Sequence, residues 1–321
     1  MSQPSSLAAL TPALSLHLLN FAARDPGPGG WQPLFEQARG ADAAGIDRLA
    51  VSDHVIMGEN LEAYGDPRLG GSEGGKQPTG PDGHWLDPLV VLSMWAAQTR
   101  HVRLMTGILI AALRRPATLA KASATLDVLS GGRLDLGVGV GWQREEYAAN
   151  GLPFEHRGAR LDQTLEVCQL LWRERAAAHH SAELSFEKIH CMPKPLQPGG
   201  VPLWISGTLN PSVLRRIARF GSGWIPWGPD ARNPVAGLAR IREALDAAGR
   251  SAKGFQVTSH IALAKRPNGA LDIDATLAPV PALVAAGITD LRVTLGLPGE
   301  AAAVTDLLAP LVAAFRKRVG R

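Results

Sequence analysis

The chain has 321 residues, 45% of them apolar and 19% charged, with a formal net charge of +4. These values are typical of a soluble globular protein with a large core, built as one large α/β domain or two small ones. Lysine and arginine are scattered rather than striped, and no basic and aromatic residues interleave, so we expect no nucleic-acid partner. No run of about 18 uninterrupted apolar residues occurs, so we expect no membrane-spanning helix.

Cysteine usage and the chain start bear on the cellular compartment. Cys168 and Cys191 fit neither a CxxC pair nor a metal-ligand spacing, and Cys168 falls on the apolar face of an expected helix. The N-terminus lacks a basic stretch before its modest apolar run, so we expect no secretory signal and a cytoplasmic protein. The adjacent His179 and His180 are expected in a loop, and they lack a third ligand at a sensible spacing, so we expect no metal site.

Strand and helix patterns alternate along the chain. Pro116 to Leu129, for example, starts with proline and carries an apolar stripe at helical spacing. In chain order, the expected strands are Leu14–Asn20, Asp47–Ser52, Val102–Ile110, Leu134–Val138, Val201–Ser206, Gly223–Pro226, Phe255–Ala264 and Asp290–Leu295. The expected helices are Trp31–Gly45, Asp87–Thr99, Pro116–Leu129, Leu161–Trp172, a helix from Gly207 to Phe220, Asn233–Ala248, Pro279–Ala286 and a closing helix.

Two segments interrupt the alternation. Met57–Gly83 is rich in glycine, proline and charge without periodicity, which indicates a long loop or lid. Arg173–Gly200 reads as an insertion after the fourth strand, with a hairpin around Ser185–His190. Eight alternations over this length predict an α/β fold, a (β/α)8 TIM barrel with insertions, as a single domain over residues 1–321. The runner-up is a doubly wound open sheet, which would want G-x-G-x-x-G after the first strand, where the chain has Phe-Ala-Ala-Arg.

Barrel enzymes place their sites at the C-terminal ends of the strands. Asp53 and His54 follow the second strand directly, and a histidine there can shuttle a proton near neutral pH. The alternative is that Asp53 caps a turn and His54 is a surface residue. Thr106 and Gly107 interrupt an apolar strand, which suggests a bulge or a close approach of the backbone to a ligand; simple tolerance of glycine is the alternative.

Two turns of small residues follow the fourth and fifth strands. These turns are Gly139-Val140-Gly141 and Ser206-Gly207-Thr208. Side by side, they make a plausible phosphate nest. Neither turn carries the lysine of a P-loop, which argues against a nucleoside triphosphatase.

Other polar and aromatic residues have mainly structural interpretations. Glu145 and Glu146 stand in the first turn of a helix, where the helix dipole favours carboxylates, and catalysis is the minor alternative. Asp135 lies in the middle of a strand and is expected to be paired or solvated. The tryptophans placed to line an apolar cleft are Trp142, Trp224 and Trp227.

The central part of the chain resembles the bacterial luciferase-like flavin and deazaflavin oxidoreductases, and in particular their F420-dependent branch. The matching words are SDH at residues 52–54, RRPATLAKASATLDVLSGGRLDLGVGVGW at 114–142, EEYAANGLPFEHRGARLDQ at 145–163 and GSGWIP at 221–226. The words MPKPLQ and PLWISG lie between the last two. The likeness extends from the first strand to at least Pro226, and the last third of the chain is only generically similar.

The resemblance implies a (β/α)8 barrel that binds a tricyclic cofactor at its C-terminal face. The cofactor is either coenzyme F420, a deazaflavin that carries hydride, or FMN, usually with a reductase and oxygen. It implies that His54 lies near the deazaflavin as proton donor or acceptor, with Asp53 orienting it. It also implies a bulge with a cis peptide bond at Gly107–Ile108. The expected cofactor contacts are Thr106, Gly107, Ile108, Val140, Gly141, Trp142, Ser206, Gly207 and Thr208, of which Gly141, Gly207 and Thr208 would meet the phosphate.

We consider three alternative functions for this protein. The first is F420-dependent hydride transfer to or from a small organic substrate. The second is an FMN-dependent monooxygenase that uses reduced FMN and oxygen and works with a separate flavin reductase. The third is a cofactor-binding protein without catalysis. F420-dependent sugar-phosphate dehydrogenases resemble this chain but have a glutamate at the position of Trp142, which argues against a phosphorylated sugar. A flavin or F420 reductase partner and a homodimer are further expectations.

Overall fold

A computed structural model describes residues 10–27 and 29–321. Residues 1–9, which bear on the expected absence of a secretory signal, and residue 28, inside the expected loop at 26–30, lie outside the described residues. Within the described part of the chain, no helix combines the length and apolarity needed to cross a bilayer.

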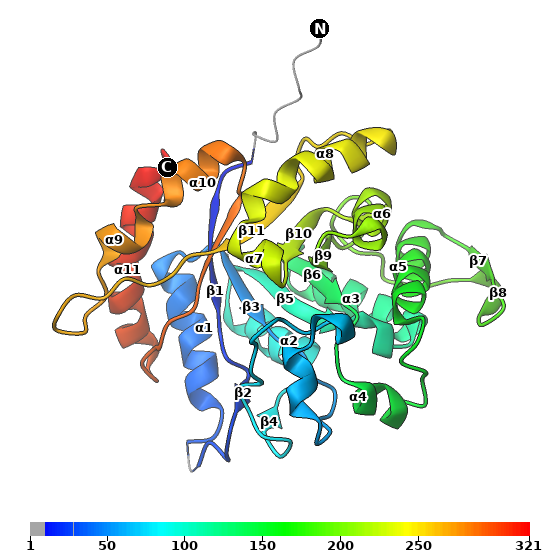
Figure 1. The fold of residues 1–321 in the computed structure, drawn as a ribbon, viewed down its shortest axis with the longest axis horizontal. Coiled ribbons are helices and arrows are strands. Elements are labelled where there is room, and N and C mark those ends of the chain that lie inside the picture. The colour runs from blue at the N-terminus through cyan, green and yellow to red at the C-terminus, as the bar shows by residue number, and fades with distance from the viewer. Residues whose placement is uncertain (1–9, 28) are drawn as a thin grey trace, which may run out of the picture.

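Eight parallel strands close into a barrel, with helices packed around it (Figure 1). The strands follow the barrel order β1-β12-β11-β10-β9-β6-β5-β3. The sheet is closed because β1 pairs with β12 on one side and with β3 on the other, so the predicted TIM barrel is confirmed and an open sheet is excluded. The bounds are β1 Ala13–His17, β3 Arg48–Val51, β5 Arg103–Ile110, β6 Leu134–Gly139, β9 Leu203–Gly207, β10 Gly223–Pro226, β11 Gln256–His260 and β12 Asp290–Val293.

Two of the surrounding helices begin at a side-chain cap. Asp87 caps α2 through the N–H groups of Leu89 and Val90, and Asn210 caps α6 in the same way. The main helices are α1 Gln32–Ala44, α2 Pro88–Gln98, α3 Pro116–Leu129, α5 Arg157–Arg173, α6 Pro211–Phe220, α8 Leu238–Ala247, α10 Val280–Ala286 and α11 Ala301–Arg318. The helix expected to begin at Glu145 and Glu146 is the short α4 Arg144–Ala149, and two further short helices, α7 Pro229–Arg232 and α9 Ile273–Leu277, were not predicted separately.

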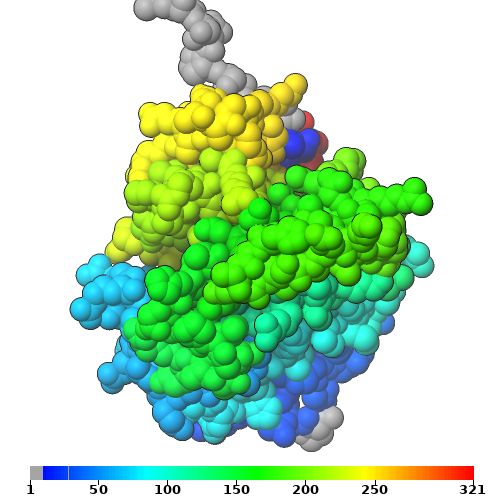
Figure 2. Space-filling model, turned by 90° about the vertical axis from the view of Figure 1, so that its right-hand side faces the viewer, coloured from blue at the N-terminus to red at the C-terminus, as the bar shows by residue number. Residues whose placement is uncertain are grey.

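The insertion after the fourth barrel strand carries the predicted hairpin. β7 Ala177–His180 pairs antiparallel with β8 Ser185–Ile189, and the two stand away from the barrel (Figure 1). The chain around residues 150–190, green in Figure 2, covers the face turned to the viewer there. His179 and His180 belong to β7, so the expectation of a loop was wrong: their backbones pair with Phe186 and Ser185.

The predicted lid, residues 57–83, contains two 3₁₀ turns at Leu61–Gly65 and Pro67–Leu69. After it, β4 His84–Trp85 pairs with β2 Phe21–Ala22. Three contacts fasten the lid to the barrel. Gly58 and Gln143 exchange two hydrogen bonds of 2.9 and 3.1 Å, Arg157 donates to the Leu69 carbonyl, and Trp227 Nε1 donates to the Gly70 carbonyl at 3.0 Å.

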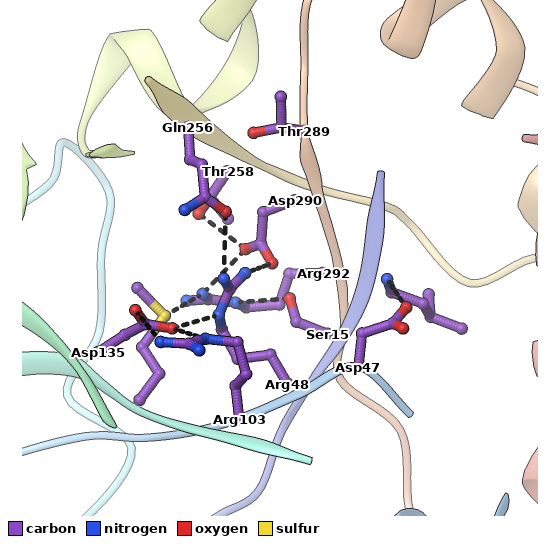
Figure 3. Close-up of polar contacts among 12 residues, drawn as sticks. Ser15, Asp47, Arg48, Arg103, Asp135, Gln256, Thr258, Thr289, Asp290 and Arg292 are labelled. Carbon is purple, nitrogen blue, oxygen red and sulfur yellow. Dashed lines mark hydrogen bonds and ion pairs between the residues drawn. The ribbon is translucent and has the colours of Figure 1, made fainter. Parts of the chain in front are cut away.

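A chain of alternating charges runs through the inside of the barrel (Figure 3). Asp135 accepts hydrogen bonds of 2.7 and 2.8 Å from Arg103 and one of 3.1 Å from Arg48. Arg48 also bonds Asp290, whose other oxygen lies 3.1 Å from Arg292 Nη2. Asp135 is therefore paired, one of the two outcomes expected for it. Since the buried charges alternate in sign and are hydrogen-bonded, each has a compensating neighbour.

We predict that Arg48→Met lowers the free energy of unfolding by about 3 kcal/mol, because two buried carboxylates lose a partner. The loss falls at the low end for a broken buried pair, since Arg103 and Arg292 remain beside Asp135 and Asp290. Urea unfolding measures it. The control is Arg68→Met, because the Arg68 side chain is 89% exposed beside Asp66 and its loss should leave the stability nearly unchanged. Equal effects of the two variants would contradict a stabilising role for the buried network.

Candidate active site

A cavity of about 350 Å³ opens at the C-terminal end of the barrel. On one side it is lined by predicted residues from the ends of β3 and β5, namely Asp53, His54, Gly107 and Ile108. On the next side it is lined by predicted residues that follow β6 and β9, namely Val140, Gly141, Trp142, Ser206 and Gly207. The residues selected because barrel sites lie at strand ends therefore line one cavity.

Thr106 and Thr208 have no place in this lining, although they were expected among the cofactor contacts. Thr106 is fully buried, and its hydroxyl donates to the Gly137 carbonyl at 2.7 Å. The Thr208 hydroxyl donates to the Trp227 carbonyl at 3.0 Å. Both hydroxyls are thus engaged within the protein, and a cofactor contact by either residue stays a prediction.

The bulge expected in the third barrel strand is present in β5. Its register against β6 shifts between Thr106 and Leu109, and Gly107 and Ile108 are joined by a cis peptide bond. A Cβ atom on Gly107 would lie 3.1 Å from Arg292 Nη1 and 3.3 Å from the Ala50 side chain. Glycine is therefore required here by crowding from the barrel interior, and its backbone forms part of the cavity wall.

The two small-residue turns also present bare backbone. Gly141 has φ +70° and Gly207 has φ +143°, conformations that side chains with a Cβ atom rarely adopt. Both glycines line the cavity. The wall formed by β5, β6 and β9 therefore combines glycine backbone with the apolar side chains of Ile108, Ile110 and Val140, a surface that suits a planar ligand.

His54 is held by Glu146, a residue 92 positions away in the chain. The His54 Nδ1 atom lies 3.3 Å from Glu146 Oε2, and the backbone N–H of Val55 donates to Glu146 Oε1 at 2.7 Å. Glu146 is fully buried and His54 is 8% exposed. An ionised carboxylate at this position only accepts, which places a proton on Nδ1 and, in the neutral tautomer of the ring, leaves the lone pair of Nε2 free.

Asp53 does not orient His54, and this expectation was wrong. Its carboxylate accepts from Arg114 Nη2 at 2.9 and 3.0 Å and from the Ile110 N–H at 2.8 Å. It therefore fastens the end of β3 to the end of β5. Glu146 stands in the first turn of α4, as predicted, but its burial and its contact with His54 go beyond a role in the helix dipole. Sequence adjacency favoured the wrong carboxylate.

Aromatic rings form an arc around His54. Its ring meets those of Trp85 and Trp142 edge-on, with centroids 4.7 and 5.6 Å apart. Tyr64 then contacts both Trp142 and Trp227, at 5.4 and 5.9 Å. Trp142 and Trp227 line the cavity as predicted.

Trp224 does not belong to this arc, so its expected place in the cleft was wrong. Its side chain is fully buried, and its Nε1 atom donates to the Gly207 carbonyl at 2.9 Å. Alternation along β10 turns this residue away from the barrel interior, whereas the neighbouring Ile225 lines the cavity.

Three polar residues that line the cavity were not predicted from the sequence. They are His17, His260 and Arg292, from the ends of β1, β11 and β12. Burial and the charge of Arg292 lower the pKa of His17 to about 3. The same causes lower the pKa of His260 to about 4, although its side chain is exposed at the cavity surface. The first strand was expected to continue to Asn20, which placed His17 inside it and hid its position at a strand end.

This barrel, with a cavity at the strand ends and a carboxylate-held histidine, defines a TIM-barrel enzyme. A family model described as luciferase-like monooxygenase matches residues 14–272. The chain belongs to this family, and it is an oxidoreductase.

Similar proteins include F420-dependent enzymes. An uncharacterized protein of Mycobacterium tuberculosis is 33% identical over 213 residues, 64% of this chain and 71% of that protein. An F420-dependent glucose-6-phosphate dehydrogenase of Kineococcus radiotolerans is 33% identical over 230 residues, 70% of this chain and 61% of that protein.

Solved structures share the fold. The monooxygenase RslO1 from Streptomyces bottropensis has a TM-score of 0.71 at 20% identity, covering 93% of this chain and 98% of that chain. An F420-dependent secondary alcohol dehydrogenase in complex with an F420-acetone adduct has a TM-score of 0.73 at 17% identity, covering 96% and 100%. At these identities, the likeness shows the fold alone.

We predict that Gly107→Leu weakens binding of F420 or FMN, whichever the protein prefers, by roughly tenfold to hundredfold. The reason is that overfilling a tight site costs roughly 1–3 kcal/mol. Fluorescence titration measures the affinity, and thermal unfolding checks that the barrel remains intact. Gly29→Leu is the matched control, because a Cβ atom there meets open space. Unchanged affinity in a folded Gly107→Leu protein would refute the close approach of ligand and backbone.

Proposed function

We propose that this protein is an F420-dependent oxidoreductase that transfers hydride to or from a small organic substrate. The observation that carries the proposal is the position of His54. Its ring lines the cavity beside a wall of bare glycine backbone, and Glu146 holds it so that Nε2 is free. The relatives named as F420-dependent glucose-6-phosphate dehydrogenases, at 33% and 30% identity, support the choice of cofactor.

The residues present fit a flat tricyclic group. Gly107, Gly141 and Gly207 put backbone rather than side chains on the cavity wall, and the arc of aromatic rings closes the side around His54. Free backbone N–H groups and small residues at the two glycine turns suit the phosphorylated end of such a cofactor. When bound, the deazaflavin would supply the hydride chemistry, and the protein would supply orientation and electrostatics.

The chain itself would manage the proton that accompanies hydride transfer. The neutral ring of His54 accepts a proton at Nε2 when the substrate is oxidised and returns it when the substrate is reduced. Glu146 stabilises the charged ring, because its carboxylate lies 3.3 Å from Nδ1. The lid and the aromatic arc keep water from the cavity, which strengthens these interactions.

We expect the substrate of this protein not to be a phosphorylated sugar. Trp142 is 5% exposed and packs against His54 and Tyr64, so the cavity has an apolar ring where the F420-dependent sugar-phosphate dehydrogenases that resemble this chain have a glutamate. The second function, an FMN-dependent monooxygenase, is favoured by the description of the matching family model and is an outcome of the first test below.

We expect tight binding of F420 and weak binding of FMN when the purified protein is titrated with each cofactor and ligand fluorescence is followed. The reverse order, together with oxygen consumption in the presence of reduced FMN, would replace the proposal by the monooxygenase function. Binding of neither cofactor would remove both.

We predict that His54→Ala lowers turnover by roughly 10²-fold or more, because the proton acceptor is lost. Cofactor affinity and thermal stability should stay near those of the original protein. The measurement is the rate of F420 reduction or reoxidation with a competent substrate. His101→Ala is the control, since this histidine is exposed and distant from the cavity lining. Full turnover in His54→Ala would eliminate His54 from the reaction.

A further inference from the structure

The charge chain inside the barrel has unequal ends. It contains three arginines and two aspartates, in the order Arg103–Asp135–Arg48–Asp290–Arg292. Arg103, at one end, has a side chain that is 33% exposed, so water screens its charge. Arg292, at the other end, is only 2% exposed and has one aspartate, which it shares with Arg48. The chain therefore has one positive charge more than it has negative charges, and at the Arg292 end this charge is shielded from solvent.

Arg292 has donors that the surrounding protein does not use. Its Nε atom bonds the Ser15 hydroxyl at 3.3 Å, and its Nη2 atom bonds Asp290 and the Met105 sulfur at 3.1 Å each. Its Nη1 atom makes no hydrogen bond with the described residues and lies at the cavity floor beside Gly107. A guanidinium nitrogen carries two N–H groups, and both are available to a ligand in the cavity.

The rest of the floor leaves this positive charge uncancelled. His17 and His260 stand on either side of Arg292, on the neighbouring strands β1 and β11. Burial keeps the pKa of His17 near 3, and the pKa of His260 is about 4, so both rings are neutral donors and acceptors at neutral pH. Among the described residues of the cavity lining, Asp53 is the one carboxylate, and Arg114 neutralises it.

The floor also faces the glycine wall. In the barrel order, β1, β12 and β11 lie opposite β9, β6 and β5. Arg292 Nη1 approaches this wall at Gly107, below the level of Gly141 and Gly207. A planar cofactor against Gly141 and Gly207 would present one edge to Arg292 and its other face toward the side that carries His17 and His260. A substrate must occupy that side to exchange hydride with the cofactor.

We propose that the floor recognises an anionic oxygen of the substrate, a carboxylate, through Nη1 of Arg292, with His17 and His260 as neutral hydrogen-bonding neighbours. The proposal rests on the proposed function and narrows its substrate class to small organic acids. An arginine–carboxylate contact is among the stronger hydrogen-bonded pairs, and here it would continue the alternation of charges by one member. The same N–H groups could also bind an anionic ring oxygen of the cofactor. The experiment below distinguishes a substrate carboxylate from a cofactor oxygen.

The first arm uses the unaltered protein and two probes of matched shape, benzoate and benzamide, in calorimetric titrations without cofactor. We expect benzoate to bind about tenfold or more tightly, because it carries the charge that the floor complements. Equal affinity for the two probes, or binding of neither at millimolar concentration, would overturn the proposal. This arm needs no variant, so it stands even where a substitution prevents folding.

The second arm compares Arg292→Met with Arg219→Met, a surface control on α6. We expect Arg292→Met to reduce the affinity for benzoate to that for benzamide, Arg292→Lys to retain part of the preference, and Arg219→Met to change nothing. Loss of F420 or FMN affinity in Arg292→Met, with benzoate binding unchanged, would assign the anion to the cofactor and overturn the proposal. Cofactor binding by the unaltered protein is read separately, so failure of the proposed function is distinguishable from failure of this inference.

Discussion

Arg48 connects strands that face each other across the barrel. It extends from β3, and its guanidinium bonds Asp135 of β6 and Asp290 of β12, which lie on opposite sides of the closed sheet. It also stacks over the ring of Trp204, 4.6 Å from the centroid. A barrel interior is ordinarily filled by layers of branched apolar side chains. Here ionic contacts hold the middle of the barrel, and the cavity lies directly above them.

This arrangement divides the cavity into two halves with different chemistry. The half formed by β5, β6 and β9 combines glycine backbone with apolar side chains such as Ile108 and Val140, and it offers shape with little charge. The half formed by β1, β11 and β12 carries Arg292 between two histidines, and the ionic contacts below fix its position. His54 lies where the aromatic arc meets the glycine wall. In the functions proposed above, cofactor binding, proton transfer and substrate selection would fall to separate groups of strands.

The sequence was sufficient for the barrel and for part of the site. All eight strands follow from apolar runs that end in polar or small residues, and the rule of strand ends located His54 and both glycine turns. Local patterns could not identify Glu146 as the partner of His54, because that contact joins residues 92 positions apart. They favoured Asp53 because it is adjacent in sequence, whereas its carboxylate bonds Arg114 and the Ile110 N–H. Arg292 was missed because a charged residue inside an apparently apolar strand gave no sign of facing a cavity.

The lid over the cavity is fastened at several points by hydrogen bonds to Gln143, Arg157 and Trp227. A net contribution of about 0.5–1.5 kcal/mol for each bond makes the lid costly to lift as a whole. Ligands therefore meet a lid that is tied to the barrel at three places. Under such a lid, we expect departure of the product, rather than the making and breaking of bonds, to set the pace of the catalytic cycle.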